Sequence, residues 1–131
     1  MEKKKVLLVD DDPAFLKAIK ARLEANSYDV ITAPNGKEGL EKIKKNNPDA
    51  VLLDIMMPEI DGLSILRQIR SQDPHLPVFM LTAYSSDEMK KIERELNASG
   101  LIMKTGDMAD EIQKISTAID MAVKFRGKTS F

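Results

Sequence analysis

Short apolar runs alternate with longer amphipathic segments along the whole chain. Five of these runs, rich in leucine or β-branched residues, are predicted to be strands: Lys5–Asp10, Tyr28–Ala33, Asp49–Asp54, Val78–Thr82 and Gly100–Lys104. After each run, apolar residues recur every three or four positions, as on one face of a helix. Apolar strands that alternate with helices are typical of a parallel sheet with helices on both faces. The pattern therefore predicts an α/β fold of five strands and five helices.

Signals at the segment ends locate the helices. Asp12 followed by Pro13 is typical of a helix start, because aspartate caps free N–H groups and proline fits the first helical position. The predicted helices are Pro13–Ala25, one capped by Asn35 and ended by Asn46-Asn47-Pro48, one opened by Asp61-Gly62, and two over about Ser86–Ala98 and Asp107–Phe125. Each helix has an apolar face that is expected to pack into the core. These core residues are Phe15, Ile19 and Leu23 in the first helix, Leu40 and Ile43 in the second, Leu63, Leu66 and Ile69 in the third, Met89, Ile92 and Leu96 in the fourth, and Met108, Ile112, Ile115, Ile119 and Ala122 in the last. In the third helix Arg67 and Arg70 are expected to point outward. The fourth helix has the weakest apolar face, so it is expected to be among the more mobile elements.

Length and composition fit one domain. The 131 residues are 43% apolar, which is enough for a single core. We expect one domain over residues 1–131, with the core at about 4–125 and residues 126–131 as a tail or truncated linker. Twenty basic and 21 acidic residues leave a formal charge of -1, so the overall balance supports neither nucleic-acid nor membrane binding.

Cysteine is absent, which excludes disulfides, thiolate metal sites and cysteine nucleophiles. This composition suits a reducing cytoplasm. The short N-terminal apolar run is broken by acids and is not a signal peptide, and no stretch is long enough to span a bilayer. A cytoplasmic protein without membrane contact is therefore expected.

Polar side chains stand where four of the five predicted strands end. They are the acids Asp10 and Asp11 after the first strand, Asp54 after the third, Thr82 after the fourth and Lys104 after the fifth. The carboxyl ends of parallel strands meet at one edge of a sheet, where ligands bind in open α/β folds. Each residue alone has an ordinary structural explanation, as a turn, a helix entry or a solvated strand end. Four strand ends with complementary groups together indicate one site.

These groups favour one kind of chemistry. Asp10 and Asp11 exceed what a helix cap needs, and neighbouring carboxylates repel each other unless a cation lies between them. A hard divalent ion with oxygen ligands, most plausibly Mg²⁺, fits this arrangement. A carboxylate beside such an ion, with a hydroxyl and a lysine, can accept a phosphoryl group. In this interpretation Asp54 is the nucleophile and forms an acyl phosphate, while Thr82 and Lys104 bind phosphoryl oxygens.

Four segments carry a resemblance to a known family. They are Val9-Asp-Asp-Asp-Pro13, Leu53-Asp-Ile-Met-Met-Pro-Glu-Ile-Asp-Gly62, Leu81-Thr-Ala83 and the strand that ends in Lys104. Together, and over essentially the whole chain, they resemble the receiver domain of two-component response regulators. The resemblance implies a flavodoxin-like sheet of order 2-1-3-4-5 and Asp54 as phosphoacceptor, with Thr82 and Lys104 at the positions that sense the phosphoryl group. It also implies Mg²⁺ binding by Asp11, Asp54 and the backbone carbonyl of Met56, with Asp10 assisting through water.

The same resemblance implies a sensor histidine kinase or phosphotransfer protein as phosphoryl donor. Phosphorylation would then switch a partner-binding surface around the fourth helix, fifth strand and fifth helix. The chain would catalyse only its own phosphoryl transfer and dephosphorylation. Its output would lie in a downstream protein or in an output domain outside this sequence, and this domain itself would not bind nucleic acid.

Two positions depart from the family pattern. Thr105 follows Lys104 where the family usually has proline, so the loop into the last helix is expected to differ. Leu101 stands where the family often has an aromatic residue that reports phosphorylation. Two other residues, Met56 and Tyr84, fall at positions beside the path of the hydrolytic water, and bulky Tyr84 is hypothesised to slow loss of the phosphoryl group.

Other functions have less support in the sequence. An Asp-nucleophile phosphohydrolase needs a second acid or base near Asp54, and Met56 stands at the expected position. A nucleotide site is disfavoured because there is no glycine-rich phosphate loop. A receiver-like docking module that is never phosphorylated stays open as the alternative, because Leu101 and Thr105 alter the usual switching positions. The cognate kinase, the pathway and the oligomeric state depend on surface detail that sequence patterns do not give.

Overall fold

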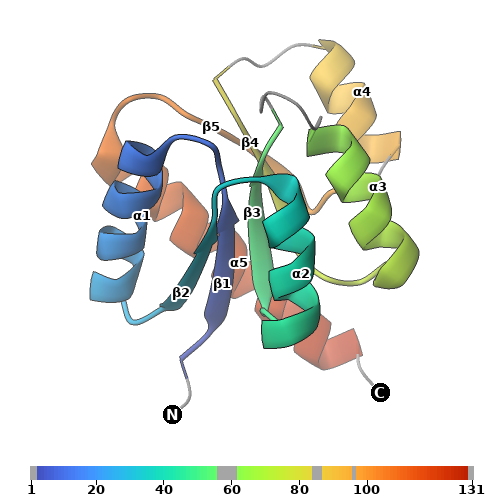
Figure 1. Ribbon diagram of the computed structural model, residues 1–131, viewed down its shortest axis with the longest axis horizontal. Coiled ribbons are helices and arrows are strands. Elements are labelled where there is room, and N and C mark those ends of the chain that lie inside the picture. Colours follow the sequence, from blue (N-terminus) through green and yellow to red (C-terminus); the bar gives the residue numbers. More distant parts are fainter. Residues whose placement is uncertain (1–2, 56–61, 84–86, 96, 130–131) are drawn as a thin grey trace.

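The five predicted strands form one parallel sheet. The computed structural model describes residues 3–55, 62–83, 87–95 and 97–129. Its strands are β1 (Lys5–Val9), β2 (Asp29–Ala33), β3 (Ala50–Asp54), β4 (Val78–Thr82) and β5 (Gly100–Met103). The sheet order is β2-β1-β3-β4-β5, and every neighbouring pair is parallel (Figure 1). The α/β class and the order 2-1-3-4-5 are thus confirmed.

A helix follows each strand. The helices are α1 (Pro13–Ala25), α2 (Gly36–Asn46), α3 (Gly62–Gln72), α4 (Asp87–Glu95) and α5 (Met108–Thr129). The bounds of α1 match the prediction, whereas α5 continues to Thr129, past the predicted end near Phe125. The sequence offers no proline there, and a glycine inside a helix costs only about 1 kcal/mol relative to alanine, so Gly127 does not end it. Residues 126–129 of the expected tail or linker are thus helical.

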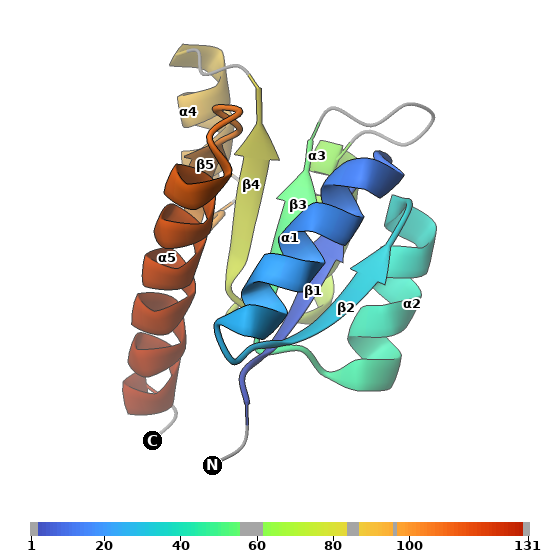
Figure 2. The same cartoon turned by 90° about the vertical axis from the view of Figure 1, so that its left-hand side faces the viewer.

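Helices cover both faces of the sheet. Figures 1 and 2 show α1 and α5 on one face, and Figure 1 shows α2, α3 and α4 toward the other. The side chains of β1 alternate between two cores: Val6 and Leu8 pack with buried residues of α1 and α5, whereas Leu7 and Val9 pack with those of α3. This alternation is the period of two that a strand imposes. Figure 2 also shows the start of β1 and the C-terminal end of α5 at the end of the sheet opposite the strand tips.

The helix faces differ from the prediction at two points. In α1 the buried residues are Leu16, Ile19 and Leu23, whereas Phe15 is only partly buried. Either Phe15 or Leu16 fits the three- or four-residue spacing of apolar positions in the first turn of α1. Which of the two side chains is buried depends on how the helix lies against the sheet. The predicted inward residues of α5 do lie against the core, with Ile112, Ile115 and Ile119 buried and Met108 and Ala122 partly buried.

Arg70 of α3 does not point outward into solvent as predicted. Its Nε donates to the carbonyl of Asn97 at 2.9 Å, and its Nη1 donates to the carbonyls of Leu76 at 2.7 Å and Asp73 at 3.2 Å. Burial lowers the pKa of this guanidinium, although the charge of Asp73 acts in the opposite direction. A helix end leaves carbonyls without partners, and arginine is long enough to satisfy several of those that lie near it.

Within the described residues, no helix is both long and apolar enough to cross a membrane.

Candidate functional site

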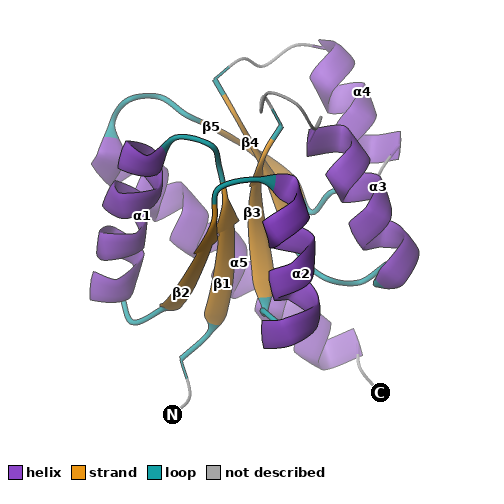
Figure 3. Cartoon of the chain, in the orientation of Figure 1, coloured by secondary structure: helices purple, strands orange, loops and turns teal. Residues whose placement is uncertain are grey.

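The carboxyl ends of β1, β3, β4 and β5 bring four predicted site residues to one rim of the sheet. Figure 3 shows the strands running in the same direction, so that their carboxyl ends lie along one edge of the sheet. Asp54 and Thr82 are the last residues of β3 and β4, while Asp10 and Lys104 directly follow β1 and β5. Asp10, Asp54 and Thr82 are buried, with exposures of 0%, 4% and 1%. Buried polar side chains in one place are unusual unless they serve a site or a network. Asp11, the fifth predicted residue, lies exposed beside them.

The turn from β1 into α1 gives each of its acids a different task. Asp12 caps α1, because its carboxylate accepts from the N–H groups of Ala14 at 3.0 Å and Phe15 at 3.3 Å. Asp10 turns inward, and its Oδ1 accepts from the Asp12 N–H at 3.0 Å. The prediction that Asp12 alone serves the helix is therefore confirmed. Asp10 and Asp11 are left for the rim.

Close packing at the end of β3 depends on a glycine. A Cβ atom at Gly62 would lie 2.5 Å from the Ile55 Cα and 2.7 Å from the Asp54 carbonyl oxygen. Both neighbours are backbone atoms, so a side chain at this position would force the start of α3 away from the strand. Gly62 thus allows the helix to begin directly against the backbone of the residue that carries the central carboxylate.

Lys104 is the cation of the rim. Its Nζ lies 2.6 Å from Asp10 Oδ2 and 3.5 Å from Asp54 Oδ2, and it stands 4.3 Å from the centre of the Phe15 ring. Burial lowers the pKa of this ammonium, but the hydrogen bonds and charges of the two aspartates outweigh burial, and the net pKa is raised. Its backbone N–H donates to the Thr82 carbonyl at 2.7 Å. Lys104 is therefore charged and is held on both its backbone and its side chain.

Negative charge exceeds positive charge at this rim. Asp10, Asp11 and Asp54 each offer a carboxylate oxygen, and these atoms lie within 4.8 Å of one another. Burial raises the pKa of Asp10, and the charge of Asp54 raises it further, although the contacts with Lys104 and Asp12 act in the opposite direction. Among the residues that the structure describes at this rim, one lysine does not balance three carboxylates. Oxygen ligands around Mg²⁺ lie about 2.1 Å from the ion and so at most about 4.2 Å apart, which small side-chain rotations would reach.

Phe15 is the contact at this rim that the sequence did not reveal. Its place in the apolar stripe of α1 predicts a core residue, yet its ring lies under the Lys104 ammonium. An aromatic face attracts a cation by about 0.5 to 1 kcal/mol at an exposed site. Nothing in the local sequence distinguishes such a ring from an ordinary core phenylalanine.

Several predictions fall on residues outside the described part of the chain. Met56, whose carbonyl is the expected third Mg²⁺ ligand, and Tyr84, the expected barrier to hydrolytic water, both lie there. The expected core side chains Met89, Ile92 and Leu96 of the fourth helix also lie outside the described side chains. These predictions stay untested.

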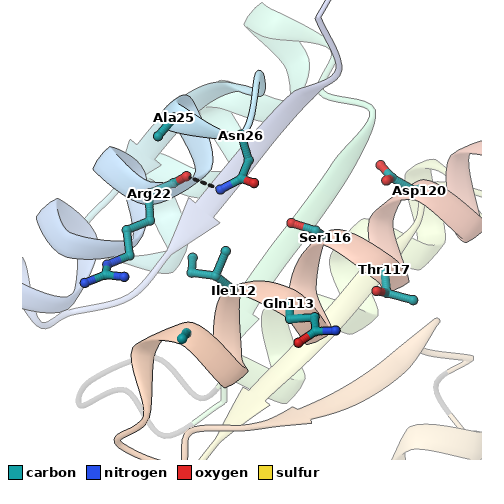
Figure 4. A pocket seen from close by; sticks show the side chains of 9 residues that line it. Arg22, Ala25, Asn26, Ile112, Gln113, Ser116, Thr117 and Asp120 are labelled. Atoms are coloured by element: carbon teal, nitrogen blue, oxygen red, sulfur yellow. Dashed lines mark hydrogen bonds between the residues drawn. The ribbon is translucent and has the colours of Figure 1, made fainter.

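A hollow between α1 and α5 is separate from the rim. Figure 4 shows Arg22 of α1 and Asn26, which follows α1, on one side of it, and Gln113, Ser116 and Asp120 of α5 on the other. The Asn26 amide donates to the Arg22 carbonyl at 2.8 Å and so closes the end of α1. Among the described residues that line this hollow, none belongs to the acidic rim. The candidate reaction site is therefore the rim.

Comparison with known proteins assigns the class. The family model for the response regulator receiver domain matches residues 6–116. This is most of the chain, and the chain belongs to the family of response regulator receiver domains. Such domains are phosphoryl-accepting modules of two-component signalling rather than ordinary enzymes, and they generally bind Mg²⁺ at an acidic cluster like that of Asp10, Asp11 and Asp54.

Solved structures agree with the family. A CheY-like receiver domain protein from Methanospirillum hungatei JF-1 is 33% identical with a TM-score of 0.83, over 93% of this chain and 98% of that one. A receiver domain protein from Clostridium thermocellum is 30% identical with a TM-score of 0.85, over 95% of this chain and 97% of that one. The flavodoxin-like fold implied by the sequence is thereby confirmed.

Curated relatives are longer than this chain. The alkaline phosphatase synthesis transcriptional regulatory protein PhoP of Bacillus subtilis is 39% identical over 101 residues, which are 77% of this chain and 42% of the relative. The response regulator MprA of Mycobacterium leprae is 44% identical over 82 residues, which are 63% of this chain and 36% of the relative. The chain thus spans less than half the length of these two proteins.

Proposed function

We propose that Asp54 accepts the phosphoryl group and that Asp10, Asp11, Thr82 and Lys104 support the transfer. The observation that carries this proposal is the acid cluster at the strand ends, with the Lys104 ammonium 3.5 Å from Asp54. Asp10 already uses one oxygen for the Asp12 N–H and the other for Lys104. That arrangement suits Asp10 to hold and orient its neighbours.

In the proposed reaction an Asp54 carboxylate oxygen attacks phosphorus in a phosphohistidine of a sensor kinase or phosphotransfer protein. The new O–P bond forms as the P–N bond breaks, and the freed imidazole nitrogen takes a proton from solvent. Lys104 then pairs with one phosphoryl oxygen, and the Thr82 hydroxyl donates a hydrogen bond to another. Later attack by water on phosphorus regenerates the Asp54 carboxylate and releases inorganic phosphate.

The proposed direct metal ligands are the side chains of Asp11 and Asp54 and the backbone carbonyl of Met56, and Asp10 would assist through a bound water. When bound, Mg²⁺ would neutralise carboxylate charge and shield the phosphoryl oxygens as the two anions approach. The donor set is all oxygen, which suits this ion. The excess of carboxylates over lysine at the rim favours the binding of such a cation.

The proposed output is a change of surface around α4, β5 and α5 that alters the binding of a downstream protein or an output domain, in the cytoplasm. The lengths and names of the curated relatives support the second kind of output. Phosphoryl charge at Asp54 would draw the Thr82 hydroxyl and the Lys104 ammonium, which lie at the ends of β4 and β5. Because Thr82 and Lys104 lie at the ends of β4 and β5, their movement would reach the surface formed by α4, β5 and α5.

Intact mass measurement tests the proposal. The protein is incubated with acetyl phosphate and Mg²⁺, and one added phosphoryl group is expected on the wild type, none on Asp54→Asn and none without Mg²⁺. Asp29→Asn is the matched control, because Asp29 is an exposed aspartate at the start of β2, at the far end of the sheet. An adduct on Asp54→Asn would contradict Asp54 as acceptor. A wild type that stays unmodified, even with a matched phosphohistidine donor, would favour the docking module.

A further inference from the structure

In the described part of the chain, one buried acid lies outside the rim. Four polar side chains are buried among the described residues, namely Asp10, Asp54, Thr82 and Glu111. The first three form the site, whereas Glu111 belongs to the first turn of α5 and is 4% exposed. A buried carboxylate is unfavourable unless it receives hydrogen bonds. Its partner therefore shows what the residue does.

That partner is the backbone of the residue next to Lys104. The Thr105 N–H donates to Glu111 Oε1 at 3.1 Å. The same loop is closed by the Asp107 N–H, which donates to Thr105 Oγ1 at 3.2 Å, and Gly106 between them has a left-handed φ of 86°. A proline at position 105 would have no N–H to offer Glu111.

The contact fixes the peptide unit that carries Lys104. On one side the Lys104 N–H donates to the Thr82 carbonyl of β4 at 2.7 Å. On the other side the next N–H along the chain, that of Thr105, is held by α5 through Glu111. The backbone of Lys104 is thus tied to the sheet and to the helix at successive N–H groups. Its ammonium reaches Asp10 and Asp54 from this fixed base.

We propose that Glu111 is a positioning residue that holds the loop after β5 so that Lys104 presents its ammonium to the phosphoryl group on Asp54. The inference rests on the proposed phosphoryl transfer. It assigns to α5 a part in the chemistry at the rim, although Glu111 itself touches no reacting atom. The Glu111 carboxylate acts on the loop through one backbone N–H, that of the exposed residue Thr105.

Substitutions at Glu111 separate this role from burial alone. Glu111→Ala removes the acceptor and is expected to slow phosphorylation by acetyl phosphate about three- to tenfold, because Lys104 is less well placed. Glu111→Gln keeps an oxygen acceptor of the same reach and is expected to stay within about twofold of the wild type. Asp110→Ala is the matched control, since it removes a neighbouring acid from the same turn that pairs with Lys114 instead.

A second background shows whether Glu111 acts through Lys104. In Lys104→Met the Glu111→Ala change is expected to have no further effect on the phosphorylation rate, while its effect on the unfolding midpoint persists. Equal slowing in both backgrounds would overturn the proposal, because Glu111 would then act independently of the lysine. Phosphorylation of the wild type together with an unchanged rate in Glu111→Ala would also overturn it and leave the proposed function intact.

Hydrogen exchange tests the contact without any phosphoryl donor. In the wild type the Thr105 amide is expected to exchange at least about tenfold more slowly than the exposed amide of Gly106, and Glu111→Ala is expected to remove this protection. The comparison of the two amides within the wild type needs no variant, so it tests the contact even if Glu111→Ala folds poorly. A Thr105 amide that exchanges as fast as that of Gly106 in the wild type would overturn the inference.

Discussion

The two ends of the sheet each hold a charged cluster, and the clusters differ in their balance. At the end where the strands begin, Lys4 Nζ lies 2.9 Å from Asp120 Oδ1, and the Tyr28 hydroxyl donates to the same oxygen at 2.7 Å. One cation, one anion and one neutral donor satisfy each other there. At the end where the strands finish, three carboxylates lie together, and Lys104 contacts two of them, Asp10 and Asp54.

The pKa values follow this difference. At the first end, burial alone would raise the pKa of Asp120, but the contacts with Lys4 and Tyr28 outweigh burial and lower it. At the second end, burial and the charge of Asp54 raise the pKa of Asp10 in spite of Lys104. The balanced cluster stabilises the fold as it stands. In the unbalanced cluster the charged form of Asp10 is unfavourable, and a further cation would relieve this, so charge imbalance marks the functional end more clearly than burial does.

The largest expected effect comes from removing the cation of each cluster. Lys104→Met should slow phosphorylation by acetyl phosphate about 100-fold, because the phosphoryl oxygens lose their charged partner. Lys4→Met should leave that rate unchanged, since its ion pair lies at the opposite end of the sheet. The rates are measured by intact mass over time at saturating Mg²⁺. Similar slowing in both variants would mean that the two clusters do not differ in function.

The balanced cluster of Lys4, Tyr28 and Asp120 should contribute less to the stability of the fold in alkaline solution. Burial, and then the hydrogen bond to Asp120, raise the pKa of Tyr28 to about 12 from 10.0. Because the folded state prefers the neutral phenol, this contribution to stability is complete below pH 10 and is lost as the pH rises through 12. The loss is at most about 2.7 kcal/mol. Urea unfolding of wild type and Tyr28→Phe from pH 9 to 12 should show it only in the wild type, and parallel curves would contradict it.

The strands and the rim could be predicted from the sequence because both are one-dimensional signals. An apolar run predicts a strand, and the polar residue at its end lies at the sheet edge wherever the neighbouring strands pair in parallel. Asp10, Asp54, Thr82 and Lys104 each end such a run, so no knowledge of side-chain packing was needed. The order of the strands came from family resemblance, since periodicity alone does not fix it.

The contacts that the sequence did not reveal join distant segments through ordinary residues. Phe15 has the spacing of a core residue, Arg70 that of an exposed helix residue, and Glu111 that of an acid at a helix start. Their partners are, respectively, the Lys104 ammonium, the carbonyl of Asn97 and the amide of Thr105. Each contact depends on how two elements meet in space. A sequence pattern describes only one of them.

The smallest expected effect is a change in the free energy of unfolding that has opposite signs when an aspartate is neutralised in each of the two clusters. Without Mg²⁺, Asp10→Asn should raise the free energy of unfolding at pH 7 by about 1 kcal/mol, because the raised pKa of Asp10 means that its buried charge disfavours the fold. Asp120→Asn should lower it by less than about 1 kcal/mol, because the lowered pKa of this half-exposed group means that its charge favours the fold. Urea unfolding measures both changes.

Mg²⁺ should reverse the sign of the effect of Asp10→Asn on the free energy of unfolding and should not change the effect of Asp120→Asn. At tenfold excess over its dissociation constant, a bound ion stabilises the wild type by about 1.4 kcal/mol, and Asp10→Asn should lose most of that gain. Asp120→Asn should gain as much from Mg²⁺ as the wild type does. If Mg²⁺ stabilised Asp10→Asn and the wild type equally, the carboxylate of Asp10 would not contribute to metal binding. The excess negative charge at the rim would then need another explanation.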